Sequence, residues 1–224
     1  IILNMLYFIF TSNLSGVDLL VFILAYLISV VLALVLHEVS HSFVAYKCGD
    51  LTAKTSGRLS FNPFSHFDVF GLISFLFIGF GWAKPVPINP YNFKNYKKGI
   101  RLVSSSGVVT NFILAFIFSG LSFFFAGNLI SSTNAFLNFL GFFLELSFLI
   151  NCSYAIFNMF PIYPLDGFNF LRSFMKPNNK FVLFMERWGN LILILFIITS
   201  AFDFIYQYFL YGIEFLFYGF WGLF

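Results

Sequence analysis

"LVLHEVSHSF", residues 34–43, places two histidines and a glutamate in a stretch that otherwise has the composition of a membrane helix. The surrounding apolar segment, 18–46, is long enough to cross a bilayer, since a crossing takes about 20 residues. Imidazole and carboxylate groups are costly in hydrocarbon, and those found there are usually functional. The stretch therefore predicts a membrane helix that carries a polar site formed by His37, Glu38 and His41.

The composition of the whole chain agrees with a membrane location. Of its 224 residues, 60% are hydrophobic, only 9% are charged and 38 are Phe, whereas soluble domains carry about 25% charged residues. An ordinary soluble domain is excluded. We predict an all-α polytopic membrane protein, a bundle of about four to six transmembrane helices. Residues 1–224 are expected to form a single integral-membrane domain.

The positions of the basic residues predict the topology. All twelve Lys and Arg fall in two windows, 47–101 and 172–187. The positive-inside rule places both windows in the cytoplasm. We therefore expect a multi-pass protein of the cell's inner (cytoplasmic) membrane, with its active site toward the cytoplasmic side. Nucleic-acid binding is disfavoured, because the basic clusters flank apolar spans.

Three further spans are expected, at 102–126, 135–160 and 189–209, with the tail 211–224 in the membrane interface. Residues 49–101 differ, because glycines, prolines and asparagines separate short apolar runs, and the longest run, 69–80, is too short to span. We predict that this region dips into the membrane as strands or a re-entrant loop shielded by protein. The catalytic core is expected at about 18–170, with extra C-terminal helices at about 189–224.

The cysteines and the N-terminus give weaker signals. Cys48 at a cytoplasmic helix end and Cys152 in an apolar span are not expected to form a disulfide in a reducing compartment. Residue 1 is Ile rather than Met, so the chain is interpreted as trimmed or as a fragment. The basic region typical of a removable signal peptide is not seen in it.

The spacing of the two histidines favours metal chemistry. In a helix, residues 37 and 41 project from the same face and can bind one ion. Zinc held by two histidines and a third ligand keeps a position for water, whose pKa falls toward about 7. The adjacent Glu38 can accept that water's proton and pass it to a leaving amine. At this composition H-E-x-x-H arises by chance about once in a thousand chains, so a merely structural polar cluster is the weaker interpretation.

A third metal ligand has to come from a small pool of candidates, which comprises His66, Asp68, Glu145 and Asp166. Asp166 is favoured because it follows Pro161 and Pro164 and precedes Gly167, so that a helix ending near residue 160 must unwind there. The predicted topology also places Asp166 and the histidines at similar depth near the cytoplasmic side. Glu145 would lie too deep, toward the opposite side.

The paired motifs resemble those of a known family. "HEVSH" (37–41) in a membrane helix, followed by "NMFPIYPLDG" (158–167), resembles the site-2 protease family of intramembrane zinc metalloproteases. The segments "GRLSFNPFSHFDVFG", "GWAKPVPINP" and "SGVVTNFILA" are similar to those that follow the catalytic helix in compact bacterial and archaeal members. Many members carry PDZ or CBS domains, and neither is expected here, because the chain as given leaves no segment for one.

The resemblance implies one zinc ion on His37, His41 and Asp166, with Glu38 as general base and acid. It makes Asn158 a candidate to stabilise the oxyanion or hold the substrate backbone, with local helix-end hydrogen bonding as the alternative. Asn111 is a second candidate of this kind, with packing between helices as the favoured alternative. His66 is expected to lie behind the ligands or to position a loop, with a histidine on a surface loop as the alternative.

The resemblance also implies an endopeptidase that cuts transmembrane segments of other membrane proteins near their cytoplasmic ends. The substrate would unwind and add as an extended strand to the strand-like dip. Such cleavage would release a cytosolic factor or clear remnant signal peptides. The alternatives are a membrane metal carrier, disfavoured by the few intramembrane acids, and a catalytically silent scaffold, disfavoured by the intact Glu38.

Overall fold

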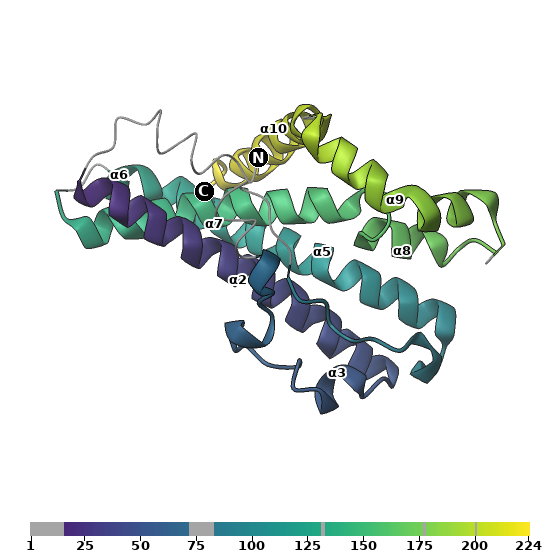
Figure 1. Cartoon of the computed structure of the whole chain (residues 1–224). Helices are drawn as coiled ribbons and strands as arrows, with labels where there is room; N and C mark the ends of the chain where they lie inside the picture. Colours follow the sequence, from purple (N-terminus) through teal and green to yellow (C-terminus); the bar gives the residue numbers. More distant parts are fainter. Residues whose placement is uncertain (1–15, 72–82, 131–132, 177, 200) are drawn as a thin grey trace.

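The computed structural model of the chain describes residues 16–71, 83–130, 133–176, 178–199 and 201–224. Three long helices, α2 (Val17–Cys48), α5 (Tyr96–Leu121) and α7 (Ala135–Met159), lie side by side and form the bundle (Figure 1). A π-helical turn (Ser122–Ala126) and α6 (Gly127–Ile130) extend α5.

Four of the helices in the described ranges are long and apolar enough to cross a membrane. They are α2, the continuous helix Tyr96–Ile130, α7 and α9 (Lys180–Ile198). This confirms the predicted all-α polytopic membrane fold.

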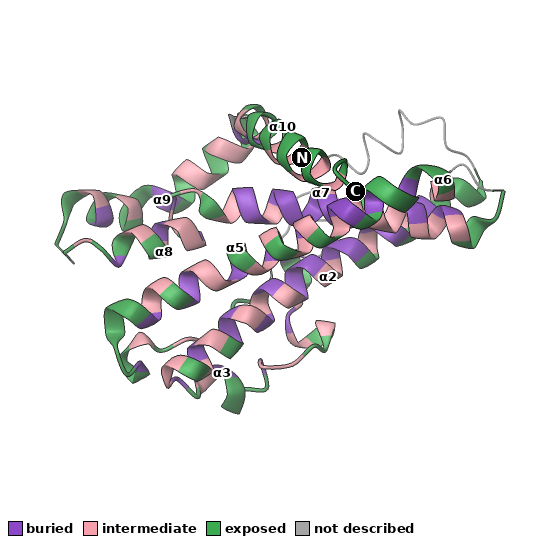
Figure 2. Ribbon diagram, turned by 180° about the vertical axis from the view of Figure 1, so that it is seen from behind, coloured by how far each residue is buried: buried purple, intermediate pink, exposed green. Residues whose placement is uncertain are grey.

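Small or polar residues at every fourth position explain how the three long helices approach one another. Figure 2 shows buried residues along the facing sides of α2, α5 and α7. Between membrane helices, close packing and hydrogen bonds replace the hydrophobic effect, so small and polar residues are favoured at such contacts. Each helix supplies a row of fully buried residues: Ala25, Ser29 and Ala33; Asn111, Ala115 and Ser119; Ser147, Asn151 and Ala155.

The outer surface of the bundle is apolar, as a surface facing lipid requires. Large side chains are exposed along α2 and α5, among them Leu20, Leu24, Ile28, Ile113 and Ile117. Three of the helices have an asparagine as N-cap residue. The side chains of Asn95, Asn134 and Asn179 each accept a hydrogen bond from a backbone N–H in the first turn. These three membrane helices therefore begin where the sequence supplies a capping residue.

The described part of the region between α2 and α5 forms no strand, so of the two predicted forms, strands or a re-entrant loop, the first is wrong there. Its described parts contain α3 (Thr52–Thr55), two 3-10 turns (Pro63–Ser65 and Pro90–Asn92) and one isolated antiparallel bridge between Phe67 and Ala83, but no strand. Prolines at 85, 87 and 90 remove the backbone donors that a strand ladder needs. The centre of the predicted dip, 72–82, lies outside the described residues.

The C-terminal part is divided differently from the prediction. The expected span 189–209 is replaced by α9, which begins earlier, and by a separate α10 (Ala201–Trp221) that includes most of the expected interfacial tail. Thr199 follows the last residue of α9, and its backbone N–H and hydroxyl both donate to the carbonyl of Leu195. Asp203 in the first turn of α10 favours a new helix start there.

Candidate active site

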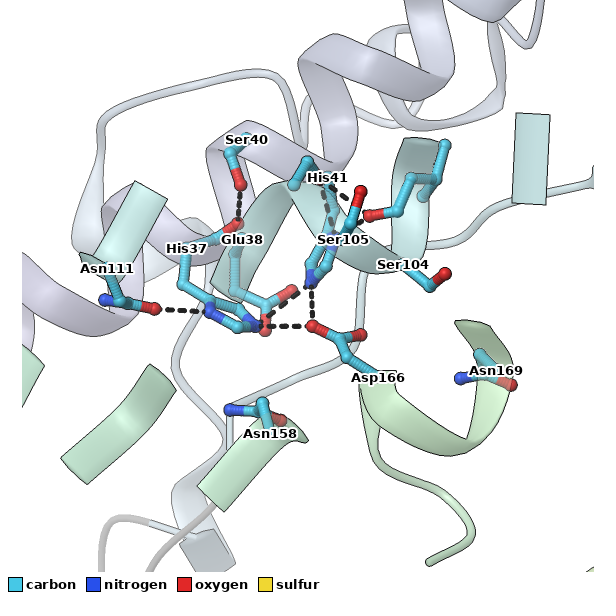
Figure 3. A network of polar contacts seen from close by, with 12 residues as sticks. His37, Glu38, Ser40, His41, Ser104, Ser105, Asn111, Asn158, Asp166 and Asn169 are labelled. Atoms are coloured by element: carbon cyan, nitrogen blue, oxygen red, sulfur yellow. Dashed lines mark hydrogen bonds and ion pairs between the residues drawn. The ribbon is translucent and has the colours of Figure 1, made fainter. Parts of the chain in front are cut away.

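Two helices bring three potential metal ligands together. His37 and His41 lie in the C-terminal half of α2, and Asp166 is the first residue of α8 (Asp166–Arg172), which follows the loop after α7. Asp166 Oδ2 is 3.3 Å from His37 Nε2 and 3.1 Å from His41 Nε2, and the two Nε2 atoms are 3.0 Å apart (Figure 3). These residues form the one group of three or more His, Cys, Asp or Glu side chains with metal-binding spacing in the described chain.

Hydrogen bonds on the other side of each imidazole fix the tautomers. His37 Nδ1 is 2.6 Å from the side-chain oxygen of Asn111, and His41 Nδ1 is 2.8 Å from the backbone oxygen of Val103. Both oxygens can only accept, so each Nδ1 carries the hydrogen and each Nε2 presents a lone pair. Second partners of this kind orient the histidines that ligate metals.

The three ligand atoms fit a zinc ion. Two lone pairs and a carboxylate oxygen, all acceptors, lie within 3.0–3.3 Å of one another. A single hydrogen cannot lie in all three contacts, whereas one cation between the atoms attracts all of them. Ligand atoms around a tetrahedral zinc, at Zn–N distances of about 2.0–2.1 Å, are about 3.3 Å apart. The donor set and its spacing therefore suit zinc.

The loop before α8 explains how Asp166 reaches the histidines. The helix α7 ends at Met159, as the prolines of the motif predict, and a short loop leads to the start of α8. A Cβ atom on Gly167 would overlap the backbone carbonyl of Met159. Only glycine allows α8 to start this close to the end of α7, which places Asp166 against α2.

A pocket opens beside the three ligands. It has a volume of about 870 Å³ and is lined by His37, Glu38, His41 and Asp166 together with apolar side chains such as Ile88 and Leu193. Figure 3 shows the Glu38 carboxylate pointing toward the same side of α2 as the histidine rings. Glu38 is half-buried. Its side chain lines the pocket next to the candidate metal position.

The two candidate asparagines lie in different places. Asn158 lines the pocket, as the predicted substrate role requires. Its amide nitrogen also donates to the carbonyl of Tyr154 at 3.0 Å, which is the local helix-end hydrogen bond given as the alternative. Asn111 is fully buried behind His37, and its amide nitrogen donates to the carbonyl of Ala33 at 3.2 Å. The structure thus places Asn111 behind a candidate ligand rather than on the pocket wall.

The other candidates for a third ligand lie apart from the three-residue group. His66 is fully buried, and its Nε2 donates to the carbonyl of Ser60 at 2.8 Å. Asp68 accepts from the backbone N–H of Gly71 at 2.9 Å. Glu145 is an exposed residue of α7. Cys48 and Cys152 are both free thiols.

No motif or spacing in the sequence singles out Asp50, a fully buried carboxylate just beyond the end of α2. It accepts hydrogen bonds from the Thr52 hydroxyl, the Asn89 N–H and the Asn92 amide, at 2.5, 2.7 and 2.8 Å. Burial acts to raise the pKa of Asp50, but these donors outweigh it and hold the pKa below its usual value. Asp50 thereby connects the segment that contains Pro90 to the end of α2. Pro90 in turn lines the pocket.

Sequence comparison relates the chain to named proteins. It is 36% identical over 173 residues to a Bacillus subtilis protein named "Putative zinc metalloprotease YwhC", a match that covers 77% of this chain and 79% of that protein. It is 29% identical over 193 residues to the Mycolicibacterium smegmatis protein named "Putative zinc metalloprotease Rip2", over 80% of this chain and 70% of that one. No protein-family model and no solved structure matches the chain.

The similarity to YwhC spans most of both chains, and the ligand geometry independently suits the metal that both names specify. We conclude that this chain belongs to the family of zinc metalloproteases that includes YwhC.

Proposed function

We propose that this chain is an intramembrane zinc endopeptidase of the site-2 protease type, which cleaves transmembrane segments of other membrane proteins. The observation that carries the proposal is the convergence of His37, His41 and Asp166 beside a pocket that Glu38 also lines. This group lies in a bundle whose helices are long enough to cross a membrane. Peptide hydrolysis at such a site would take place within or at the edge of the bilayer.

The chain's own residues supply most of the proposed chemistry. His37, His41 and Asp166 would hold zinc, which polarises a carbonyl and makes water a good nucleophile at neutral pH. Glu38 takes the proton of the attacking water and returns it to the amine that leaves, so no net proton is consumed in the two transfers. Asn158, on the pocket wall, is the candidate donor to the oxyanion or to the substrate backbone.

The pocket favours an extended substrate. A peptide bond in a transmembrane helix is shielded by its own helix, so the segment has to unwind before water can attack. The apolar pocket walls, with residues such as Tyr154 and Phe157 of α7 and Leu193 of α9, suit the side chains of such a segment. Binding of the unwound segment as a strand would satisfy its backbone groups.

The basic residues support a cytoplasmic orientation of the site. Lys47 lies in the last turn of α2, just beyond the histidines, and Arg172 ends α8, which begins with Asp166. By the positive-inside rule, both ends face the cytoplasm. We therefore propose an inner-membrane protein that cuts near the cytoplasmic end of its substrate, to release a cytosolic factor or to clear remnant signal peptides.

Two other functions have less support. A membrane metal carrier would need further ligands along a path, and the described residues contain one ligand group. A silent scaffold would not need Glu38 beside the metal position.

Cleavage of a model transmembrane substrate by the purified full chain tests the proposal. Glu38→Gln removes the proton acceptor, so we expect the rate to fall by a factor of about 10²–10⁴ while zinc is retained. Glu145→Gln, on the exposed side of α7, is the matched control and should cleave at the wild-type rate. Cleavage by Glu38→Gln at the wild-type rate would contradict the proposed mechanism.

A further inference from the structure

A chain of buried polar side chains lies behind His37 and crosses from α2 to α5 and α7. The side-chain amide of Asn111 is 2.6 Å from His37 Nδ1 and also donates to Asn151 Oδ1 at 2.8 Å. The amide nitrogen of Asn151 donates in turn to the backbone carbonyl of Ser147 at 2.7 Å. Asn111, Asn151 and Ser147 are all fully buried.

The carbonyl at the far end sets the direction of every hydrogen bond in this chain. The carbonyl of Ser147 can only accept, so the Asn151 amide nitrogen must face it and Asn151 Oδ1 must face Asn111. The two hydrogens of the Asn111 amide then go to Asn151 Oδ1 and to the carbonyl of Ala33. Asn111 Oδ1 is left facing His37, and because it only accepts, the hydrogen of His37 has to sit on Nδ1.

A reversed Asn111 amide would break the arrangement. Its oxygen would face Asn151 Oδ1 and the carbonyl of Ala33, which are both acceptors, and buried polar groups without partners are costly. Its nitrogen would then face His37 Nδ1 and favour the tautomer with the hydrogen on Nε2. That hydrogen would point into the group formed with His41 and Asp166.

The two histidines differ in how their tautomers are fixed. His41 Nδ1 bonds directly to the backbone carbonyl of Val103, whose direction is set by the helix α5. His37 depends on a side-chain amide, whose orientation is held by the carbonyl of Ala33 and by Asn151 Oδ1, the shorter of the two contacts. We propose that Asn151 is a positioning residue, which together with the carbonyl of Ala33 fixes the metal-binding tautomer of His37 by orienting Asn111. This inference rests on the proposed function insofar as His37 is taken as a metal ligand.

The zinc affinity of the full chain in detergent, measured by competition with a chromophoric chelator, tests this inference. Partners that bond directly to metal-ligating histidines are worth about 10–100-fold in affinity. Asn151 acts through such a partner, so Asn151→Leu should bind zinc about tenfold more weakly than the wild type. The matched control is Asn138→Leu. Asn138 is a buried asparagine of the same helix that bonds to Asp18 instead, so its replacement should leave the zinc affinity unchanged.

A double-mutant cycle separates positioning from a general structural role. If Asn151 acts through Asn111, then Asn151→Leu should cause little further loss of zinc affinity in a chain that already carries Asn111→Leu. A loss of equal size in both backgrounds would overturn the inference, as would an Asn151→Leu chain that binds zinc like Asn138→Leu.

A conservative variant covers the case in which Asn151→Leu does not fold. A protonated acid in Asn151→Asp can donate to the carbonyl of Ser147 and still accept from Asn111, so in mildly acidic buffer its zinc affinity should stay close to that of the wild type. A loss of about tenfold or more in this variant would overturn the inference. Failure of the wild-type chain itself to bind zinc would instead contradict the proposed function.

Discussion

Gly107 of α5 lies directly against the imidazole ring of His37 on α2. A Cβ atom on Gly107 would overlap the ring, with Nε2, the atom that faces the metal position, among the closest atoms. Asn111 follows one helical turn later on the same face of α5 and bonds to Nδ1 of the same ring. One turn of α5 therefore both makes room for His37 and holds it.

Gly107→Ala should consequently weaken metal binding. The added methyl group would push His37 away from His41 and Asp166, and we expect the affinity for zinc to fall at least about tenfold, as for other losses of ligand support. Gly127→Ala is the matched control, because a Cβ atom there meets no other atom within 4 Å. If the Gly107→Ala chain binds zinc as tightly as the wild type, the close contact with His37 is wrong.

The placement of Asp166 makes a second prediction. A methyl group at position 167 would overlap the backbone carbonyl of Met159, which cannot move without distorting the end of α7, so Gly167→Ala should displace Asp166 from the histidines. Zinc that binds only the folded chain raises its unfolding temperature. Removal of zinc with a chelator should therefore lower the unfolding temperature of the wild type and leave that of Gly167→Ala nearly unchanged. An equal drop in both chains would contradict this account of the glycine.

A pH dependence is expected from Asp50. Its pKa is lower in the folded chain than in the unfolded chain, where it is about 3.9. The stabilisation that Asp50 contributes is therefore fully present above the unfolded-state pKa and is lost as the pH falls through the folded-state pKa. Asp50→Asn should lower the free energy of unfolding by about 1–3 kcal/mol near neutral pH, because the donors around the Asp50 carboxylate lose their charged partner.

Unfolding of both chains at several pH values tests the role of Asp50. The difference in stability between wild type and Asp50→Asn should shrink as the solution is made acidic. Hydrogen exchange should also become faster at the backbone N–H of Asn89, which bonds to the carboxylate. A stability difference that is constant down to the lowest pH would show that the charge of Asp50 does not contribute.

The convergence of His37, His41 and Asp166 could be predicted from sequence because the position of each depends on local rules. Helical periodicity alone brings residues 37 and 41 to one face, and the prolines before Asp166 end α7 where the structure ends it. The membrane helices were predictable for a similar reason, since their length and apolarity are properties of single segments.

The residues behind the ligands could not be predicted in the same way. Whether Asn111 faces a substrate or a histidine depends on how α5 packs against α2, which a single segment does not specify. A signal was present, however, in the glycine one turn before it, since small residues mark close helix contacts in membranes. Asn151 carries no comparable signal, because its role depends on a third helix.

The zinc content of the purified chain tests the central claim most directly. Elemental analysis should find one zinc ion per wild-type chain and per Glu38→Gln chain, because Glu38 lies beside the metal position without binding the metal. His37→Ala, His41→Ala and Asp166→Ala should each lose the ion, since each removes one of three converging ligand atoms. A full zinc content in Asp166→Ala would contradict the claim that the two motifs share one metal.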